Sequence, residues 1–344
     1  MREAEKHSLT VTLGIWLPRT GEGDYGDERF LASQEDRVRR AVMRHRDAPA
    51  LLMWAVGNEA EGDGSDPRVF EQLERLAQIV HEFDPSRPVM TVIAGLGGGK
   101  KVKDLARLAP SIDVVGINSY GGAATIGKQY RAAGGKRPFV LTEFGPLGHW
   151  ECAKTPWGLP IEESSTAKAE RYRETFERGV ENDSLCLGSY AFLWGEKQET
   201  TATWYGMLLA DGTRLGAVDV MSELWTGKEP KNRCPTIQGI KGVPSGGIVK
   251  PGARLSVAVR AKDPDGDRLK VEWILRAASQ GDGAYGASED RLREFPKAIQ
   301  RARKLTARAV LPKDPGSYRL FAYVRDGKGN AAVHNVPLLV EEPD

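Results

Sequence analysis

Six short runs of apolar residues, many of them β-branched, recur along the first two thirds of the chain. Each run is almost continuously hydrophobic, which is typical of a strand buried on both faces of a parallel sheet. The runs lie at residues 9–17, 51–56, 89–94, 114–120, 139–144 and 187–194. This pattern predicts a parallel sheet of six strands.

Helical periodicity separates these runs. Residues 68–83 place Val69, Leu73, Leu76 and Val80 on one face, as expected for a helix that packs on a sheet. Further helices are predicted at residues 34–46, 102–109 and 165–182. Strands that alternate with helices indicate βα units with right-handed crossovers.

From about residue 228 the pattern changes. Prolines and glycines predict a linker over residues 228–250. Strands with alternating apolar and polar residues then follow at 254–260, 269–275, 306–310, 317–325 and 332–340. We predict an immunoglobulin-like β-sandwich over residues 251–344, with a charged helical or mobile insertion at residues 289–304.

Polar and aromatic side chains gather where four predicted strands end. Asn58 and Glu59 follow the second strand, Tyr120 ends the fourth, Glu143 lies near the end of the fifth, and Trp194 ends the sixth. In a (β/α)8 barrel this rim is where active sites form. Residues 1–227 are therefore predicted to be a partial (β/α)8 barrel.

A doubly wound sheet would instead carry a phosphate-binding glycine turn after an early strand. The glycine-rich residues 95–101 are the candidate for such a turn. They follow a mid-chain strand and lack the P-loop spacing, which favours an ordinary loop.

Two glutamates at the rim are candidates for acid–base chemistry. Glu59 ends an apolar run, and partial enclosure there would raise the pKa of its carboxyl toward the working pH. Glu143 lies in an otherwise apolar strand, where an ionisable group needs a partner or a function. Cleavage of a glycosidic bond uses two such groups, one protonated and one ionised. Alternatively, Asn58 and Glu59 cap the next helix, and Glu143 forms a buried ion pair.

The neighbouring side chains suit a sugar. Asn58 could bond a sugar hydroxyl, and Tyr120 could donate a hydrogen bond that keeps Glu143 ionised. Trp194 and Trp150 could stack on an apolar sugar face. The alternatives are a capping tyrosine and ordinary core tryptophans. No histidine cluster has metal-ligand spacing, so we expect neither a catalytic metal nor a cofactor.

The order of these motifs resembles the barrel domain of glycoside hydrolase family 2. Basic residues at 38–46 precede the run WAVGNE at residues 54–59, and TEFG at residues 142–145 is similar to that family's nucleophile strand. The resemblance covers about residues 2–226. It implies a retaining double displacement with Glu143 as nucleophile and Glu59 as acid/base, their carboxyls roughly 5–5.5 Å apart. Tyr120 and Trp194 match the family's aromatic positions.

Compared with that family, the chain lacks several expected features. Counted back from Glu59, residues 9–17 are the third barrel strand, so strands one and two have no counterpart. The family's strand-two arginine and its preceding β-sandwich domains also have no match. We interpret the chain as a fragment of a longer product, or as one whose translation was assigned to an internal methionine.

Three functions are considered, of which the first, a retaining β-glycosidase, is favoured for the full-length protein. The first is a glycosidase or transglycosylase acting on β-linked glycans. The second is a non-catalytic carbohydrate-binding or scaffold protein derived from a glycosidase, which the missing strands favour. The third is an adhesion or structural role led by the C-terminal domain. The sugar, the linkage and the oligomeric state are not indicated by the sequence.

The composition limits the classes of partner that the sequence indicates. With 49 basic and 47 acidic residues the formal charge is +2, so no strong field points to nucleic acid or an anionic membrane. No apolar run is long enough to span a bilayer, and no signal peptide is visible. A secreted or periplasmic location is implied by the resemblance alone. The three cysteines, Cys152, Cys186 and Cys234, could include one disulfide but are more typical of isolated thiols.

The sandwich contains one acidic turn, formed by residues 263–267 (DPDGD). It resembles turns of PKD-like or cadherin-like modules. Asp263, Asp265 and Asp267 could together hold Ca²⁺, but the spacing is too short for an EF-hand. A solvated turn is the favoured interpretation.

Overall fold

The structure, a computed structural model, describes residues 1–279 and 286–342, with the side chain of Ser245 excepted. The chain divides into two compact units. The first comprises Met1–Phe144 and Glu177–Tyr190, and the second comprises Gly145–Phe176 and Ala191–Asp344. Each unit is described separately.

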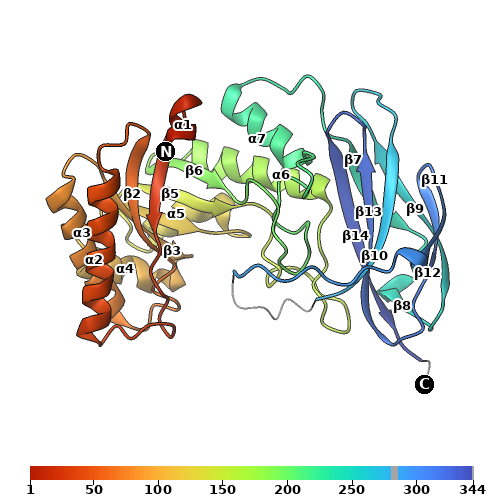
Figure 1. Cartoon of the computed structure of the whole chain (residues 1–344), viewed down its shortest axis with the longest axis horizontal. Helices are drawn as coiled ribbons and strands as arrows, with labels where there is room; N and C mark the ends of the chain where they lie inside the picture. Colours follow the sequence, from red (N-terminus) through yellow and green to blue (C-terminus); the bar gives the residue numbers. More distant parts are fainter. Residues whose placement is uncertain (280–285, 343–344) are drawn as a thin grey trace. The chain divides into compact units, whose positions relative to one another are not determined.

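The first unit is built on a sheet with the strand order β1-β2-β3-β4-β5-β6 (Figure 1). Neighbouring strands from β1 to β5 run parallel. The strands are β1 (Val11–Ile15), β2 (Leu51–Asn58), β3 (Val89–Ala94), β4 (Val114–Asn118), β5 (Phe139–Phe144) and β6 (Cys186–Ala191). Strands β1 and β6 are the outer strands of the described sheet. The predicted fold class, a barrel lacking its first two strands, is thus confirmed as a half-barrel.

Helices connect the strands, as the alternating pattern predicted. They are α1 (Arg2–Lys6), α2 (Glu28–His45), α3 (Pro67–Phe83), α4 (Lys100–Leu108) and α5 (Ile126–Ala132). Asp27 and Asp66 cap α2 and α3 by accepting backbone N–H bonds, and Pro67 sits at the first position of α3, where a missing N–H costs nothing. The helix α5 was missed from sequence, and Lys100 and Lys101, assigned to a loop, begin α4.

The concave interior of this sheet is apolar and contains a cavity. Met53, Met90, Val92, Val114 and Val140 belong to one buried cluster on it. The hydroxyls of Thr12 on β1 and Tyr190 on β6 lie 2.5 Å apart, so the sheet curls until side chains of its two outer strands meet. The rim residues of successive strands therefore face a common space.

The second unit contains two four-stranded sheets, with the orders β10-β13-β14-β8 and β11-β12-β9-β7 among the described residues (Figure 1). Pairing is antiparallel except between β14 and β8. Apolar residues of both sheets form one core, which includes Trp273, Leu275 and Leu320. The strands are β7 (Thr236–Lys241), β8 (Ile248–Val249), β9 (Arg254–Lys262), β10 (Lys270–Ala277), β11 (Ile299–Arg303), β12 (Thr306–Val310), β13 (Gly316–Arg325) and β14 (Ala331–Val340).

Two segments of this unit differ from expectation. Residues 228–250, expected to be a linker, contain β7 and β8, because their prolines and glycines lie between short strands and not within them. Residues 289–304, expected to be helical or mobile, contain β11, whose side chains are mostly exposed. A charged strand of this kind is typical of a sheet edge, which must resist further pairing.

The second unit also includes two helices, α6 (Ser165–Thr175) and α7 (Gly216–Thr226). The Ser165 hydroxyl accepts a hydrogen bond from the backbone of Val333 on β14, and that of Thr166 from Ile237 on β7. Helix α6 is shorter than predicted and is followed by a π-helical turn, Phe176–Glu181. The compact unit therefore extends N-terminally beyond the domain boundary expected at residue 228.

Two further observations bear on the chemistry of the chain. Cys152, Cys186 and Cys234 are free thiols. Within the described residues, no helix is both long and apolar enough to cross a membrane.

Candidate active site

Glu59 follows directly on β2 in an unusual backbone conformation. Its φ angle is +53°, and that of Gly57 is +77°. The left-handed region is costly for a residue with a Cβ, so this bend is held by its surroundings. The Glu59 amide donates to the carbonyl of Val92 at 2.8 Å, and the residue is only 9% exposed. The enclosure expected of this carboxyl is present.

Both carboxylate oxygens of Glu59 have partners. Arg19 Nη2 lies 3.0 Å from Oε2, and Arg19 Nε donates to the Glu59 carbonyl at 3.2 Å. Asn118 Nδ2 donates to Oε1 at 2.9 Å and to Asn58 Oδ1 at 3.1 Å. The carboxyl is thus held from two sides, by a residue that follows β1 and by the last residue of β4.

Glu143 lies on β5, beside β4. The Tyr120 hydroxyl donates to its Oε2 at 2.6 Å, as anticipated from sequence. Asn118 is opposite Glu143 in the β4–β5 register, and its Oδ1 accepts from the neighbouring Thr142 hydroxyl at 2.7 Å. Asn118 therefore links the two glutamates: it bonds one of them and pairs in the sheet with the other.

The segment after Glu59 is anchored by a buried ion pair. Lys101 Nζ lies 2.7 Å from Glu61 Oε1 and also donates to the carbonyls of Gly62 and Ala94. Burial raises the pKa of Glu61 against the opposing effect of Lys101. Lys101, which ends the glycine-rich segment, thus supports the loop that follows Glu59.

The cavity within the half-barrel is lined by the residues that directly precede the two glutamates. Asn58 and Thr142 line it together with Thr12, Trp16 and Tyr190. Trp16 follows β1 and is 59% exposed, so its ring is available for a sugar face. Of the candidates for stacking named from sequence, Trp150 and Trp194 belong to the second unit and are both exposed. Their role remains a prediction.

Three functional candidates were missed from sequence: Arg19, Asn118 and Trp16. A signal existed for each. Arg19 and Trp16 follow the first strand, and Asn118 ends the fourth, at the same rim as the two glutamates. Asn118 does not stand out from the sequence, because its hydrogen bonds depend on the sheet register.

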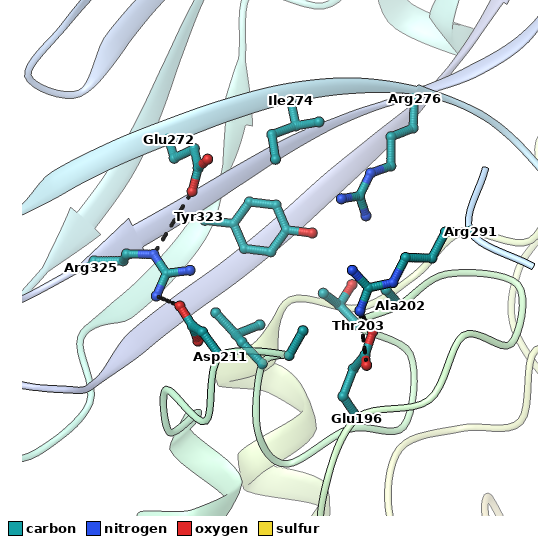
Figure 2. Close-up of a pocket in the computed structure, with 12 residues that line it drawn as sticks. Glu196, Ala202, Thr203, Asp211, Glu272, Ile274, Arg276, Arg291, Tyr323 and Arg325 are labelled. Carbon is teal, nitrogen blue, oxygen red and sulfur yellow. Dashed lines mark hydrogen bonds and ion pairs between the residues drawn. The ribbon is translucent and has the colours of Figure 1, made fainter. Parts of the chain in front are cut away.

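The second unit has a polar pocket of its own, shown in Figure 2. Its acidic side chains face arginines: Glu196 lies 3.0 Å from Arg291, and Asp211 lies 2.9 Å from Arg325. The third, Glu272, approaches the same Arg325 at 3.9 Å. Ion pairs of this kind are common structural features of proteins. The two glutamates singled out from the sequence, Glu59 and Glu143, lie instead in the first unit.

A curled parallel sheet with two carboxyl groups at the carboxyl ends of its strands is an arrangement typical of TIM-barrel glycosidases. Residues 3–149 match the family model described as "Glycosyl hydrolases family 2, TIM barrel domain". The match covers less than half of this chain and agrees with the resemblance that its motifs show.

Individual relatives agree with this assignment. The chain is 28% identical over 123 residues to a beta-galactosidase of Klebsiella pneumoniae, a match that covers 34% of this chain and 11% of the relative. It is 25% identical over 170 residues to a beta-glucuronidase of Paenibacillus borealis, covering 45% of this chain and 27% of the relative. The chain thus spans well under a third of these relatives.

A solved structure shows the fold at greater length. The beta-glucuronidase 2 of Bacteroides uniformis, covalently bound to cyclophellitol-6-carboxylate aziridine, is similar over 99% of this chain and 40% of its own. The TM-score is 0.53 and the sequence identity 15%, which is a likeness of fold alone.

Proposed function

We propose that this chain carries the catalytic acids of a retaining β-glycosidase, with Glu143 as nucleophile and Glu59 as general acid/base. The observation that carries the proposal is the shared neighbour Asn118, which bonds Glu59 and is opposite Glu143 in the sheet. Glu59 follows β2 and Glu143 lies on β5, so both carboxyl groups lie at the carboxyl ends of strands of one parallel sheet, and a double displacement requires two such groups.

In the first step, Glu143 attacks the anomeric carbon while Glu59 gives its proton to the departing glycosidic oxygen. A glycosyl–carboxylate bond forms as the glycosidic bond breaks. In the second step, Glu59 takes a proton from water, and that water displaces Glu143. The Tyr120 hydroxyl keeps Glu143 ionised and oriented, since a hydrogen bond to a carboxylate favours its charged form.

The substrate class is proposed from the relatives, whose names specify β-galactosides and β-glucuronides. A hexose or uronic acid residue at the non-reducing end of a glycan would fit a site whose walls include Trp16 and Asn58. Action on such glycans outside the cytoplasm, in a secreted or periplasmic protein, is part of the same proposal.

The test uses aryl β-galactosides and β-glucuronides with the wild-type chain and three variants. E143A should abolish turnover, and azide should restore it with an α-glycosyl azide as product. E59A should slow turnover by roughly 10²–10⁴-fold, with azide yielding the β-anomer. E71A, an exposed glutamate of α3, is the matched control and should leave turnover unchanged.

A non-catalytic role in carbohydrate binding is the second candidate, because β1 and β6 are unpaired on their outer sides in the described sheet. It predicts sugar binding without turnover, and equal affinities for the wild type and E143A. Turnover by the wild type that E143A lacks would reject this role.

A further inference from the structure

A group of three carboxylates lies at one end of the β-sandwich. Asp263 and Asp267 belong to the turn between β9 and β10, and Asp326 to the turn between β13 and β14. Strands β10 and β13 pair with Lys270 opposite Arg325, which brings these two turns together. Since β9 belongs to the other sheet, the group spans both layers of the sandwich.

The three side chains converge. One carboxylate oxygen of each lies within 4.8 Å of those of the other two. Asp263 and Asp326 are buried, with 8% and 5% of their surfaces exposed, and Asp267 is partly buried. Like charges this close repel strongly where water is scarce, so a cation among the three carboxylates would stabilise the arrangement.

One oxygen of the group is buried without a partner. Asp263 Oδ1 accepts from the amides of Asp265 and Asp267, at 2.9 and 3.0 Å, which holds the turn. Asp263 Oδ2 makes no hydrogen bond within the described part of the chain. A buried carboxylate oxygen of this kind ordinarily bonds a donor or a metal.

Within the part of the chain that the structure describes, no lysine, arginine or histidine side chain forms a salt bridge with Asp263, Asp267 or Asp326. Asp265, the middle acid of the same turn, instead pairs with Arg233 at 2.9 Å. Arg233 thus compensates the acid outside the group of three.

We propose that Asp263, Asp267 and Asp326 bind a calcium ion that joins the two turns. Carboxylate oxygens are ligands for hard cations, and the group contains neither histidine nor cysteine, which zinc and copper would favour. Calcium accepts an irregular oxygen shell completed by water or backbone carbonyls, whereas magnesium demands a near-ideal octahedron. This proposal differs from the solvated turn that the sequence favoured. It also differs from the ligand set considered there, because Asp326 is a ligand and Asp265 is not.

Amide side chains orient two of the ligands. Asn232 Nδ2 donates to Asp267 Oδ2 at 2.7 Å, and Asn330 Nδ2 donates to Asp326 Oδ2 at 2.6 Å. The same Asn330 group also bonds Asn232 Oδ1 at 2.6 Å. Such bonds hold the carboxylates in place and leave lone pairs on their oxygens for an ion. Calcium would thereby also fasten the segment of Asn232, which precedes β7.

The test titrates CaCl₂ into the full chain after removal of metals with EDTA. Isothermal titration calorimetry should give one calcium per chain, with a Kd on the order of 10⁻⁴–10⁻³ M or tighter. Saturating calcium should raise the thermal midpoint by several degrees, and EDTA should reverse the shift. MgCl₂ at the same concentration should do much less.

Two variants and a control locate the site. D263N keeps an Oδ1 acceptor for the turn and should weaken calcium binding at least tenfold, as should D267N. D265N alters the acid paired with Arg233 and should bind calcium like the wild type. Circular dichroism without metal checks that each variant is folded, and a variant that does not fold is replaced by N232A, which should weaken binding by disturbing Asp267.

The proposal is overturned if the wild type binds no calcium at 10-fold the weakest Kd expected above, or binds magnesium alone. Equal loss of calcium binding in D265N and D263N would also overturn it. These outcomes are independent of glycosidase activity, since the variants lie in the sandwich and the proposed catalytic acids lie in the half-barrel.

Discussion

At the residue scale, Arg19 determines how the Glu59 side chain is held. It bonds both the carboxylate and the backbone carbonyl of that residue, so one guanidinium fixes both the direction of the side chain and the bend beneath it. The planar fork of arginine makes this double contact possible, and a lysine could make only part of it. Arg19 is a positioning residue for the proposed acid.

We expect R19Q to lower kcat by about ten- to a hundredfold while KM changes little, because a misplaced acid affects the transition state more than substrate binding. R19K should recover part of the loss. Steady-state kinetics on an aryl β-glycoside provide the measurement. R39Q on the surface of α2, whose arginine pairs only with Asp36 among the described contacts, is the control. Equal kcat values for R19Q and the wild type would contradict the role.

Only part of the candidate site could be predicted from the sequence, because some of its residues stand out in the local pattern and others do not. Glu59, Glu143 and Tyr120 stood out because each interrupts or ends an apolar run. Arg19 and Asn118 did not, because their importance comes from hydrogen bonds across strands remote in sequence. Asp326 escaped notice in the same way, since only the β10–β13 register brings it to Asp263.

At the element scale, a buried aspartate fastens α3 to the strand that leads to Glu59. Asp84 follows α3 and accepts from Trp54 Nε1 on β2 at 2.9 Å, and Arg87 lies 3.0 Å from the same oxygen. Burial alone would raise the pKa of Asp84, but the hydrogen bonds from Trp54, Ser86 and Arg87 outweigh it and lower the pKa below its usual value.

The depressed pKa of Asp84 makes its contribution to the free energy of unfolding depend on pH. A carboxyl whose pKa is depressed by folding stabilises the native state above its unfolded pKa of about 3.9, and that stabilisation is lost as pH falls through the folded pKa. D84N should therefore lower the free energy of unfolding at pH 7 by about 1–3 kcal/mol. The deficit relative to the wild type should shrink as the pH is lowered below 4.

Urea unfolding at pH 7, 5 and 3 tests this expectation. D36N, which removes an exposed acid of α2 paired with Arg39, should change stability by less than about 0.5 kcal/mol at each pH. A deficit in D84N that is constant over the whole range would show that the charge of Asp84 contributes nothing.

Elements with a strong periodic signal were predictable, and short or edge elements were not. The strands β2 to β5 are continuous apolar runs, and α3 has a regular apolar face, so their patterns persist without tertiary context. By contrast, β8 has two residues and β11 is mostly exposed, so neither carries enough alternation to be distinguished from a loop. Their pairing depends on partners distant in sequence.

At the scale of the whole molecule, the second unit is held by a buried polar network. Arg319 on β13 donates to the carbonyl of Pro160 and to Asn335 on β14, and burial lowers its pKa to about 10. Asn335 in turn bonds Glu162, which pairs with Lys168 of α6 at 2.5 Å. Buried charges of this kind are costly once a partner is removed.

Truncation after residue 227 should therefore disrupt the folded structure of the residues that remain. Without β13 and β14, Glu162 and α6 lose Asn335 and their packing surface, so we expect residues 1–227 to be poorly soluble or to lose cooperative unfolding. Size-exclusion chromatography and thermal unfolding of residues 1–227 and of the full chain provide the comparison. A monomeric fragment that unfolds as cooperatively as the full chain would contradict this view.

The left-handed backbone at Glu59 has a consequence for directed evolution. A glycine there would relieve the bend, and relief of this kind commonly adds about 1 kcal/mol to stability. The same substitution would remove the carboxylate that Arg19 and Asn118 bond, and with it the acid that the proposed chemistry requires. Screens of this chain for robustness need a simultaneous demand for turnover.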